Sequence, residues 1–297
     1  MVTRRLFAIS AGAGLLGGAL GRVESASAGD AWSGDFGREI ARIESGLKAR
    51  LGVAVLDTAT GQRASHRGGE RFPMCSTFKT LACGAVLKRL DAGEEDLSRR
   101  IRFVAGDVVA YSPVTKDRVG GTGMTLGELC EAAMTQSDNT AANLILKALG
   151  GPPAVTRFAR SLGDPVTQLD RWETDLNEAT PGDPRDTTTP DAMAANLHAL
   201  AVDGGLSQRS RGRLNAWLVA NKTGDARLRA GLPKDWRIGD KTGSGDHGTA
   251  NDVAVMWPPR RGPLVASVYI TETKAFFDEC NAAIAEVGRA VRTALGA

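Results

Sequence analysis

Short runs of alternating apolar and polar residues lie near both ends of the chain, a pattern typical of strands that bury one face. Residues 51–56 show it, and residues 64–66 form a shorter return run after a turn. Residues 252–257 and 264–271 are rich in β-branched residues and flank a turn bounded by prolines. Each end of the chain is therefore predicted to form an antiparallel hairpin.

Apolar residues at helical spacing mark one segment beside each hairpin. Residues 36–51 and residues 276–295 are both predicted to form amphipathic helices, and the second is expected to pack on the sheet. The apolar positions are Phe36, Ile40, Ile43 and Leu47 in the first segment, and Phe277, Cys280, Ile284, Val287 and Val291 in the second.

The middle of the chain has helical periodicity interrupted by glycine and proline. Thr125-Leu126-Gly127-Glu128 is a capping-box pattern that opens a helix through Met134, and residues 139–149 form a second apolar helix closed by Gly150-Gly151. We therefore expect a sheet lobe built from residues 29–71 and 221–297, with a helical lobe of residues 72–220 inserted into it. A cleft between two such lobes is a natural ligand site.

The first 28 residues have the pattern of an export signal. Thr3-Arg4-Arg5-Leu6-Phe7 is a twin-arginine pattern, an apolar run covers residues 8–20, and Ala26-Ser27-Ala28 fits a cleavage site. The alternative is a membrane anchor, but the apolar run is shorter than the roughly 20 residues that a membrane-spanning helix needs. We expect Tat-type export to the periplasm or the medium, with cleavage of residues 1–28 and no stable membrane association afterwards.

The balance of charge excludes one large class of partner. The whole chain of 297 residues has a formal net charge of +3. Removing residues 1–28 removes three arginines and one glutamate, a net of two positive charges, and leaves +1. Nucleic-acid binding depends on clustered Lys and Arg, so the sequence gives it no support. The three histidines are scattered without metal-ligand spacing, so neither a metal nor another cofactor is expected.

Ser76 and Lys79 place a hydroxyl and an amine three residues apart, adjacent on one helical face. The residues that follow are almost all apolar, so this helix should be buried. A serine at its N-terminus can form an ester, and a desolvated lysine loses its proton more easily than one in water. The pattern alone is not specific, because Ser45 and Lys48 repeat it on the helix predicted for residues 36–51.

Two further short patterns carry possible chemistry. Ser137-Asp138-Asn139 lies between two predicted helices, where its alternative role is to cap the second helix. The tripeptide Lys-Thr-Gly occurs twice, at residues 222–224 and 241–243. The first copy follows an apolar helix and is predicted to lie in a loop, whereas the second lies on a predicted strand. A strand edge can pair with an extended ligand, so we assign the second copy to a site.

The three patterns occur in the order found in penicillin-recognising serine acyltransferases. The chain most closely resembles class A serine β-lactamases, and the resemblance covers nearly all of it after the signal. It is most specific at Arg171-Trp172-Glu173-Thr174-Asp175-Leu176-Asn177, which is similar to the omega loop of that class. Residues 111–115 and 248–252 match the family as well.

The resemblance implies an α+β fold, an α/β sandwich with an antiparallel five-stranded sheet flanked by N- and C-terminal helices. It also implies an enzyme that hydrolyses the amide of penicillins and cephalosporins through an ester on Ser76. We expect a monomer, since nothing in the sequence argues against one. Glu173 would activate the water that cleaves this ester. The alternatives are a D,D-peptidase or a penicillin-binding sensor that stays acylated, and a binding module without activity.

Residue roles follow from the same resemblance. Arg171 and Asp186 would close the omega loop, and Arg227 would supply the guanidinium that many relatives carry at the position of Ala250. Backbone N–H groups of Ser76 and Ser244 would form the oxyanion hole. The implied catalytic residues are Ser76, Lys79, Ser137, Glu173 and Lys241, and the implied substrate-binding residues are Tyr111, Asn139, Asn177, Arg227, Thr242, Gly243 and Ser244.

The resemblance also bears on the four cysteines. Cys83 and Cys130 match a disulfide pair of the family, which the chain-entropy model values at up to about 4 kcal/mol. Cys75 matches a cysteine that carbapenem-hydrolysing relatives pair with a second one just after Lys-Thr-Gly. Gly245 stands at that second position here, so the bridge cannot form. Cys75 and Cys280 are expected to be buried free thiols.

Overall fold

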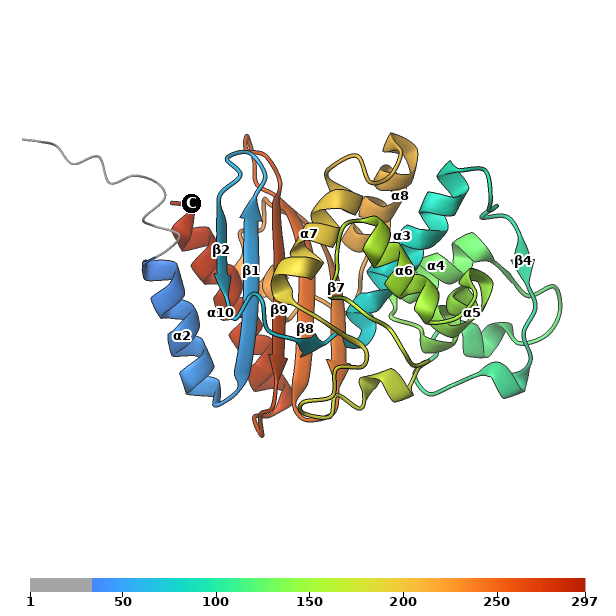
Figure 1. The fold of residues 1–297 in the computed structure, drawn as a ribbon, viewed down its shortest axis with the longest axis horizontal. Helices are drawn as coiled ribbons and strands as arrows, with labels where there is room; N and C mark the ends of the chain where they lie inside the picture. Colours follow the sequence, from blue (N-terminus) through green and yellow to red (C-terminus); the bar gives the residue numbers. More distant parts are fainter. Residues whose placement is uncertain (1–33, 297) are drawn as a thin grey trace, which may run out of the picture.

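A five-stranded antiparallel sheet forms the centre of the protein (Figure 1). The computed structural model describes residues 34–296, and the predicted export signal lies outside them. Strand order is β2-β1-β9-β8-β7, so β7 is an edge strand. The strands are β1 (Arg50–Asp57), β2 (Arg63–His66), β7 (Arg237–Gly245), β8 (Thr249–Trp257) and β9 (Leu264–Thr271). The predicted hairpins and the fold class are therefore confirmed.

Both faces of the sheet are covered, which explains the near-continuous burial of its central strands. In β1, Val53 and Val55 belong to one hydrophobic core, while Ala54 and Leu56 belong to the other. Alternate side chains point to opposite faces of a strand, so one sheet serves two cores. The larger core extends from the sheet into the helical lobe.

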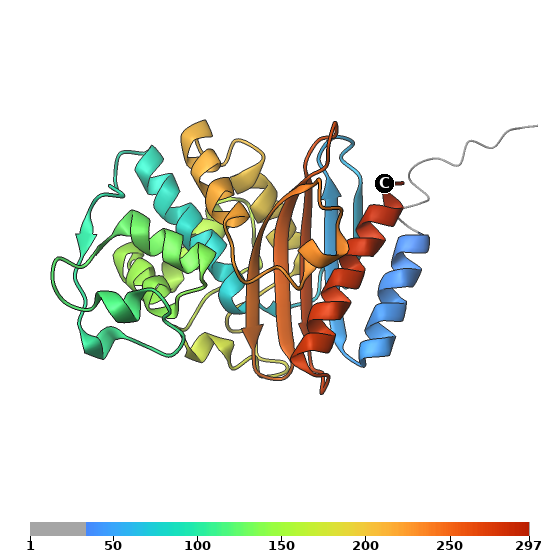
Figure 2. The same cartoon turned by 180° about the vertical axis from the view of Figure 1, so that it is seen from behind.

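The two terminal helices cover the outer face of the sheet (Figure 2). They are α2 (Asp35–Leu47) and α10 (Phe277–Ala294), as predicted from their apolar spacing. Helix α2 ends earlier than expected, because Lys48 adopts a left-handed conformation with φ 50° and β1 begins at Arg50. None of the helices within residues 34–296 has the length and hydropathy of a membrane-spanning segment.

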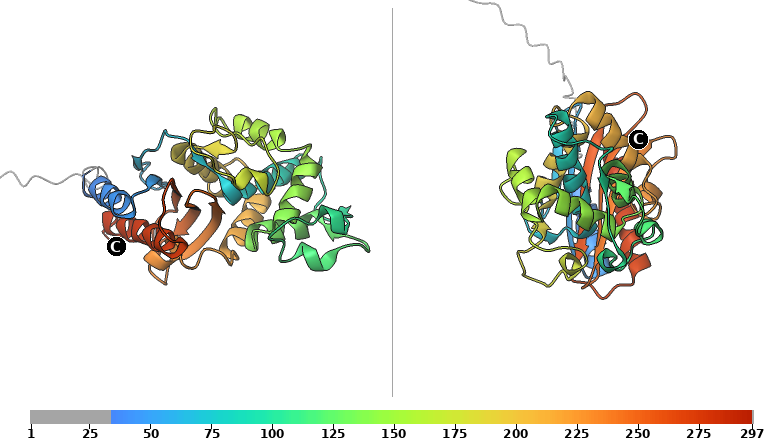
Figure 3. Two further views of the ribbon diagram at one scale, coloured as in Figure 1. Left: turned by 90° about the horizontal axis from the view of Figure 1, so that it is seen from below. Right: turned by 90° about the vertical axis from the view of Figure 1, so that its right-hand side faces the viewer.

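Helices from the middle of the chain cover the inner face and form the second lobe (Figures 1 and 3). Helix α3 runs through the centre of this lobe, and its first ten residues are buried. Helix α7 lies against the sheet itself. The helices are α3 (Phe78–Asp91), α4 (Leu126–Thr135), α5 (Asn139–Leu149), α6 (Pro153–Ser161), α7 (Pro190–Ala201), α8 (Gln208–Val219) and α9 (Leu228–Gly231).

Short elements that periodicity does not reveal connect these helices. They are the 3₁₀ turns η1 (Cys75–Thr77), η2 (Ala105–Asp107), η3 (Thr115–Arg118) and η4 (Asp175–Asn177), and two ladders, β3 (Phe72–Pro73) with β6 (Thr187–Thr188) and β4 (Arg100–Ile101) with β5 (Met124–Thr125). The η1 turn brings the chain from the sheet to the first turn of α3, at the boundary of the two lobes.

The predicted helix caps are present. Thr125 and Glu128 form the capping box of α4. Asp138 accepts a hydrogen bond from the N–H of Ala141 at the start of α5, and Gly150 ends that helix with φ 98°. These caps fix where α5 begins, and therefore where Ser137 and Asn139 lie.

Candidate active site

The predicted site residues surround one cavity at the boundary of the two lobes. It has a volume of about 550 Å³. Lys79, Glu173 and Lys241 lie buried beside it. Its lining is Ser76, Tyr111, Ser137, Asn139, Asn177, Lys222, Thr223, Arg227, Thr242, Gly243, Ser244 and Phe277.

Ser76 and Lys79 form the first contact of the site. Ser76 lies in η1, directly before α3, and its Oγ accepts a hydrogen bond from Lys79 Nζ at 2.9 Å. The other Ser-x-x-Lys pair has no such setting. Ser45 is exposed on α2, and Lys48 lies beyond the last residue of that helix. Burial and neighbours therefore distinguish the two copies of this pattern.

Lys79 Nζ lies at the centre of a group of oxygen atoms. Its side chain is fully buried and pairs with Glu173 Oε1 at 2.9 Å. It also donates to Asn139 Oδ1 at 2.7 Å and to the backbone oxygen of Ser137 at 2.8 Å. Because a buried ammonium without partners would be very unfavourable, these oxygens are what keep Lys79 in the site.

The Ser137-Asp138-Asn139 segment both caps α5 and contributes side chains to the site. Asp138 caps α5 and also accepts hydrogen bonds from the backbone N–H groups of Val114 and Thr115, so it holds the neighbouring loop. Ser137 has φ 57°, which turns its side chain between Lys79 Nζ at 3.5 Å and Lys241 Nζ at 3.0 Å. The capping role and a role in the site are therefore both present.

Asn139 and Tyr111 border the same cavity. The Nδ2 of Asn139 donates to the backbone oxygen of Ala110 at 3.0 Å, and its N–H donates to the backbone oxygen of Tyr111. Tyr111 has φ 56° and a largely exposed ring. The ring can therefore contact a ligand at the rim, while Asn139 is held from two sides.

Glu173 reaches Ser76 from the omega loop. Its Oε1 lies 3.4 Å from Ser76 Oγ, and its Oε2 accepts a hydrogen bond from Asn177 Nδ2 at 2.6 Å. The peptide bond between Glu173 and Thr174 is cis. The loop therefore places a carboxylate within reach of both the hydroxyl of Ser76 and the ammonium of Lys79.

Two contacts hold the omega loop in place. Arg171 Nε donates to the buried carboxylate of Asp186 at 2.6 Å, and the backbone N–H groups of Asp170 and Arg171 donate to the same carboxylate. Arg171 also pairs with Glu178. This ion pair, expected from the resemblance, closes the base of the loop.

Asn143 makes the second contact and was missed by the sequence analysis. Its Oδ1 accepts from the N–H of Glu173 at 2.9 Å, and its Nδ2 donates to the backbone oxygen of Glu173, also at 2.9 Å. The amide thus pairs with the backbone of Glu173 as a neighbouring strand would. The available signal was the spacing from Asn139, since residues four apart share one face of a helix.

Lys241 enters the site from the edge strand β7. Its Nζ donates to Ser137 Oγ at 3.0 Å and to the backbone oxygen of Thr242 at 2.8 Å. The side chain is fully buried, and burial together with the nearby charge of Lys79 lowers the pKa of Lys241 to about 7. Lys241 therefore changes its charge near neutral pH.

Close backbone contact explains the glycine of this tripeptide. A Cβ on Gly243 would lie 2.8 Å from the backbone oxygen of Met74 and 3.2 Å from the N of Ser76. Asn251 on β8 supports the same turn by donating from its Nδ2 to the backbone oxygens of Pro73 and Met74. Glycine is thus required for β7 to lie against the turn that carries Ser76.

Arg227 lines the cavity beside β7. It is buried, and its Nη2 donates to Ser244 Oγ at 2.8 Å, while its Nη1 donates to the backbone oxygen of Gly243. Ala250 on β8 pairs with Ser244 in the sheet register. Burial lowers the pKa of Arg227, and Asp252 and Asp240 oppose this shift.

The first Lys-Thr-Gly copy also lies at the cavity, since Lys222 and Thr223 line it together with Thr242 and Gly243 of the second copy. Residues 222–224 are in a loop, as predicted, but the loop packs against β7. Thr223 Oγ1 is 2.5 Å from Thr242 Oγ1. A residue need not lie on a strand to reach the cavity. Tertiary packing brings Thr223 there from a loop.

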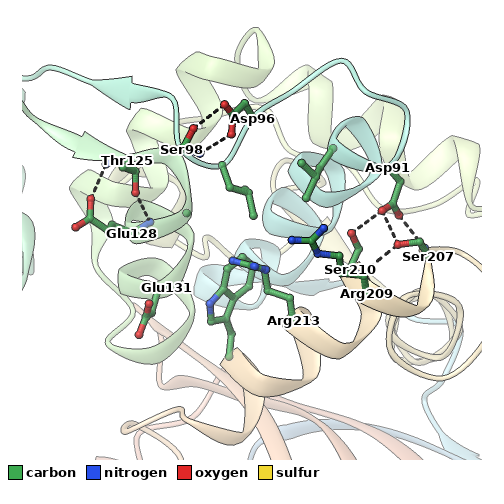
Figure 4. A pocket seen from close by; sticks show the side chains of 14 residues that line it. Asp91, Asp96, Ser98, Thr125, Glu128, Glu131, Ser207, Arg209, Ser210 and Arg213 are labelled. Atoms are coloured by element: carbon green, nitrogen blue, oxygen red, sulfur yellow. Dashed lines mark hydrogen bonds between the residues drawn. The ribbon is translucent and has the colours of Figure 1, made fainter.

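A second cavity lies elsewhere, among α3, α4 and α8 (Figure 4). It has a volume of about 820 Å³, and neither lysine nor histidine lines it. Its serine hydroxyls, including Ser98, Ser207 and Ser210, donate to Asp91 or Asp96. These hydroxyls face carboxylates on the surface rather than a buried amine, so the chemistry belongs to the smaller cavity.

The cysteines differ in part from the expectation. Cys75 and Cys280 are buried free thiols, as predicted, and a Cβ on Gly245 would lie 2.7 Å from Cys75 Sγ. Cys83 and Cys130 are also free thiols, so the predicted disulfide is not formed in the structure. The two thiols are nevertheless neighbours, and a hydrogen bond with Cys83 together with burial raises the pKa of Cys130 well above its usual range. Conversion of these two thiols to a disulfide requires oxidation, which depends on the compartment in which the protein resides.

No group of three or more His, Cys, Asp or Glu side chains within residues 34–296 is arranged to hold a metal ion. The site brings together two serine hydroxyls, those of Ser76 and Ser137, two buried lysines and one buried carboxylate. This constellation, set between a five-stranded sheet and a helical lobe, defines the class of penicillin-recognising serine enzymes.

Comparison with known proteins places the chain within that class. The model of the beta-lactamase enzyme family matches residues 35–295. The chain is 54% identical over 256 residues to beta-lactamase AST-1 of Nocardia asteroides, which covers 86% of this chain and 82% of that protein. It is 48% identical over 242 residues to beta-lactamase CTX-M-8 of Citrobacter amalonaticus, covering 82% and 83% of the two chains.

A solved structure gives the same result. The reconstructed class A beta-lactamase of the last common ancestor of Gram-negative bacteria (GNCA4) superposes with a TM-score of 0.86 and 61% identity. The match covers 88% of this chain and 99% of that one. The chain belongs to the beta-lactamase enzyme family, and its resemblance to class A is confirmed.

The pKa of Lys241 can be tested directly. In a protein with ¹³C-labelled lysine, the Cε resonance of Lys241 should titrate near pH 7, well below the ordinary lysine value of about 10.4. Lys79→Met removes the neighbouring positive charge and should raise the midpoint of Lys241. Lys79→Arg keeps the charge and should leave it low. The Lys241 resonance is assigned as the one that disappears in Lys241→Arg. A Lys241 that stays charged up to pH 9 would show that its pKa is not lowered.

Proposed function

We propose that this protein hydrolyses the cyclic amide of β-lactams through an ester on Ser76, and so confers resistance to them. The observation that carries the proposal is the position of Glu173, whose carboxylate reaches both Ser76 Oγ and Lys79 Nζ. The relatives that span most of the chain bear the name beta-lactamase, which supports the same activity.

Acylation begins with attack of Ser76 Oγ on the lactam carbonyl carbon. Ser76 Oγ donates to Glu173 Oε1 at 3.4 Å, whereas Lys79 Nζ donates to Ser76 Oγ at 2.9 Å and can take its proton only after giving one of its own to Glu173. The backbone N–H groups of Ser76 and Ser244 stabilise the oxyanion, and each such donor is worth about 3 kcal/mol. Because Ser76 lies just before the N-terminus of α3, the helix dipole favours the same negative charge.

Breakage of the ring C–N bond needs a proton for the departing nitrogen. Ser137 Oγ is the group placed to deliver it, since it borders the cavity and lies between the two lysines. Lys79 or Lys241 then replaces the proton that Ser137 has given. The three side chains therefore form a short relay from Ser76 to the leaving nitrogen.

Deacylation requires a water molecule beside the ester. Asn177 Oδ1 is buried and has no protein partner within the described chain, and it lies next to the carboxylate of Glu173. These two acceptors fit the two protons of one water, which leaves a lone pair of that water for attack on the ester carbonyl. Glu173 takes the proton, and the proton then returns to Ser76 as the ester C–O bond breaks.

The remaining residues recognise the substrate. Lys241, Thr242, Ser244 and Arg227 gather charge and hydroxyl donors at the β7 side of the cavity, where the β-lactam carboxylate binds. Asn139 and Tyr111 border the opposite side, where the amide side chain of the substrate binds. Because β7 is an edge strand, its backbone can offer main-chain hydrogen bonds to the same side chain.

A D,D-peptidase or a penicillin-binding sensor remains the alternative function. Both would form the same ester on Ser76 but would have to protect it from water. A buried carboxylate 3.4 Å from the ester oxygen does the opposite, because it is a base for water. Glu173 therefore favours the hydrolase.

We also propose that the protein is exported, is monomeric and carries a disulfide between Cys83 and Cys130. The twin-arginine pattern and the cleavage motif support export, and the contact between the two buried thiols supports oxidation in an oxidising compartment.

Substitution of the general base tests the central step. Glu173→Gln should still form the ester with a chromogenic cephalosporin but should cleave it about 10²–10⁴-fold more slowly, the usual contribution of one general base. Stopped-flow absorbance and intact mass should show a burst followed by a persistent adduct. Asp175→Asn, an exposed change in the same loop, should behave as the parent does.

The same assay separates the alternatives. Ser76→Ala should form no adduct, since the ester oxygen is missing. Glu173→Gln turning over at the parental rate would remove Glu173 from its role. A parent protein that forms one stable adduct would instead support the peptidase or sensor, and no adduct at all would support a binding module.

Native mass spectrometry of the protein recovered from the periplasm or the medium tests the other proposals together. The expected species is one chain that begins directly after Ala28 and is lighter than the reduced sequence by the two hydrogens of one disulfide. Reduction should restore those two hydrogens, and Cys83→Ser should lack the difference. A chain that keeps residues 1–28, a dimer, or four free thiols would each contradict the corresponding proposal.

A further inference from the structure

The first Lys-Thr-Gly copy is built into the wall of the active site rather than lying near it by chance. The N–H of Lys222 donates to the backbone oxygen of Thr135 at 2.9 Å, which ties the loop to the end of α4. A Cβ on Gly224 would lie 1.9 Å from Asp240 Oδ2, so only glycine allows the loop to lie this close to β7. Asp240 directly precedes Lys241, and the two copies therefore pack side by side.

A chain of hydrogen bonds links this loop to the substrate side of β7. Asn221 Nδ2 donates to Asp240 Oδ2 at 2.7 Å, which fixes the orientation of the amide. Asn221 Oδ1 therefore faces Thr223, whose N–H donates to it at 3.1 Å and whose Oγ1 lies 2.9 Å away. Thr223 Oγ1 then meets Thr242 Oγ1 at 2.5 Å. Asp240, Asn221, Thr223 and Thr242 thus form one continuous series.

Each hydroxyl has a single proton, so this series has two arrangements. In the first, Thr223 donates to Asn221, and Thr242 donates to Thr223. In the second, Thr223 donates to Thr242, and Thr242 donates into the cavity. An anion in the cavity favours the second arrangement, because only then does Thr242 offer it a proton.

Ser244 has a comparable partner behind it. Arg227 Nη2 donates to Ser244 Oγ, and a guanidinium cannot accept, so the proton of Ser244 is free to face the cavity. On β7 the side chains of Thr242 and Ser244 share one face, since they are two residues apart. Each of the two hydroxyls therefore has a neighbour that can donate to it, Thr223 for Thr242 and Arg227 for Ser244.

We propose that Thr223 is a positioning residue for the substrate carboxylate, and that it does so by holding Thr242 and directing its proton into the cavity. The inference rests on the proposed function, because the anion is the carboxylate of the β-lactam. Thr223 does not touch the reacting atoms. Its effect should therefore appear in the recognition of the carboxylate and not in the cleavage of the ester.

Thr223→Val tests the inference with nearly the same side-chain shape. A methyl group cannot donate and cannot approach an oxygen as closely as the hydroxyl does at 2.5 Å, so Thr242 should lose its position. KM for benzylpenicillin should rise about tenfold, the effect of losing about 1.4 kcal/mol, while kcat should change less than about twofold. Thr223→Ser keeps the hydroxyl and should restore KM.

The neutral methyl ester of benzylpenicillin provides the matched substrate control. With this ester the ratio of kcat/KM between the parent and Thr223→Val should be close to one, because no carboxylate is present to be recognised. In a Thr242→Ala background the change Thr223→Val should add nothing further, since the hydroxyl that it positions is gone.

Several outcomes would overturn the inference. They are an unchanged or lower KM for the acid in Thr223→Val, an equal loss for the acid and the ester, or an additive loss in the double variant. The proposed function is tested separately in the same assay. A parent protein without turnover would refute the function, whereas a parent with normal turnover and an unaffected Thr223→Val would refute only the role of Thr223.

Discussion

The buried ion pair between Lys79 and Glu173 is the interaction on which the rest of the site depends. Both side chains are fully enclosed, and their charged atoms are 2.9 Å apart. Removing one partner of such a pair typically costs 3–5 kcal/mol, because the other charge is left without compensation. The pair therefore binds the omega loop to the first turn of α3 and places both possible bases beside Ser76. Arg171 with Asp186, and Asn143 with the backbone of Glu173, keep the loop where this pair can form.

The surrounding backbone is held in conformations that most side chains avoid. Cys75, Tyr111 and Ser137 all have positive φ, at 44°, 56° and 57°. Such residues cost about 1–3 kcal/mol each and persist only where the neighbouring structure determines them. Here Cys75 turns the backbone directly before Ser76, and Ser137 is turned so that its side chain lies between two lysines. These strained conformations lower the stability of the fold, but they align Ser76, Ser137 and Lys241 around one cavity.

Local rules predicted the framework well, because its causes are local. The capping box at Thr125, the glycine closing α5, and the alternation in β1 each follow from residues close together in sequence. The same rules failed for Thr223, because the orientation of its side chain is set only when the loop packs against β7. They also failed for Asn143, whose amide pairs with a backbone thirty residues away. The disulfide depends on oxidation, which neither sequence nor packing contains.

The protein is best understood as two sets of hydrogen bonds that meet at Ser76. One set, made of Lys79, Glu173 and Asn177, supplies the chemistry, and the other, along β7, receives the charge of the substrate. The most direct test is to follow the ester on Ser76 by rapid-quench mass spectrometry of the unmodified protein with a slowly hydrolysed β-lactam. The account predicts a transient adduct of the intact substrate mass on the peptide that carries Ser76, followed by a return to the free mass as product appears. Product formation with no adduct on that peptide, or an adduct that never decays, would contradict it.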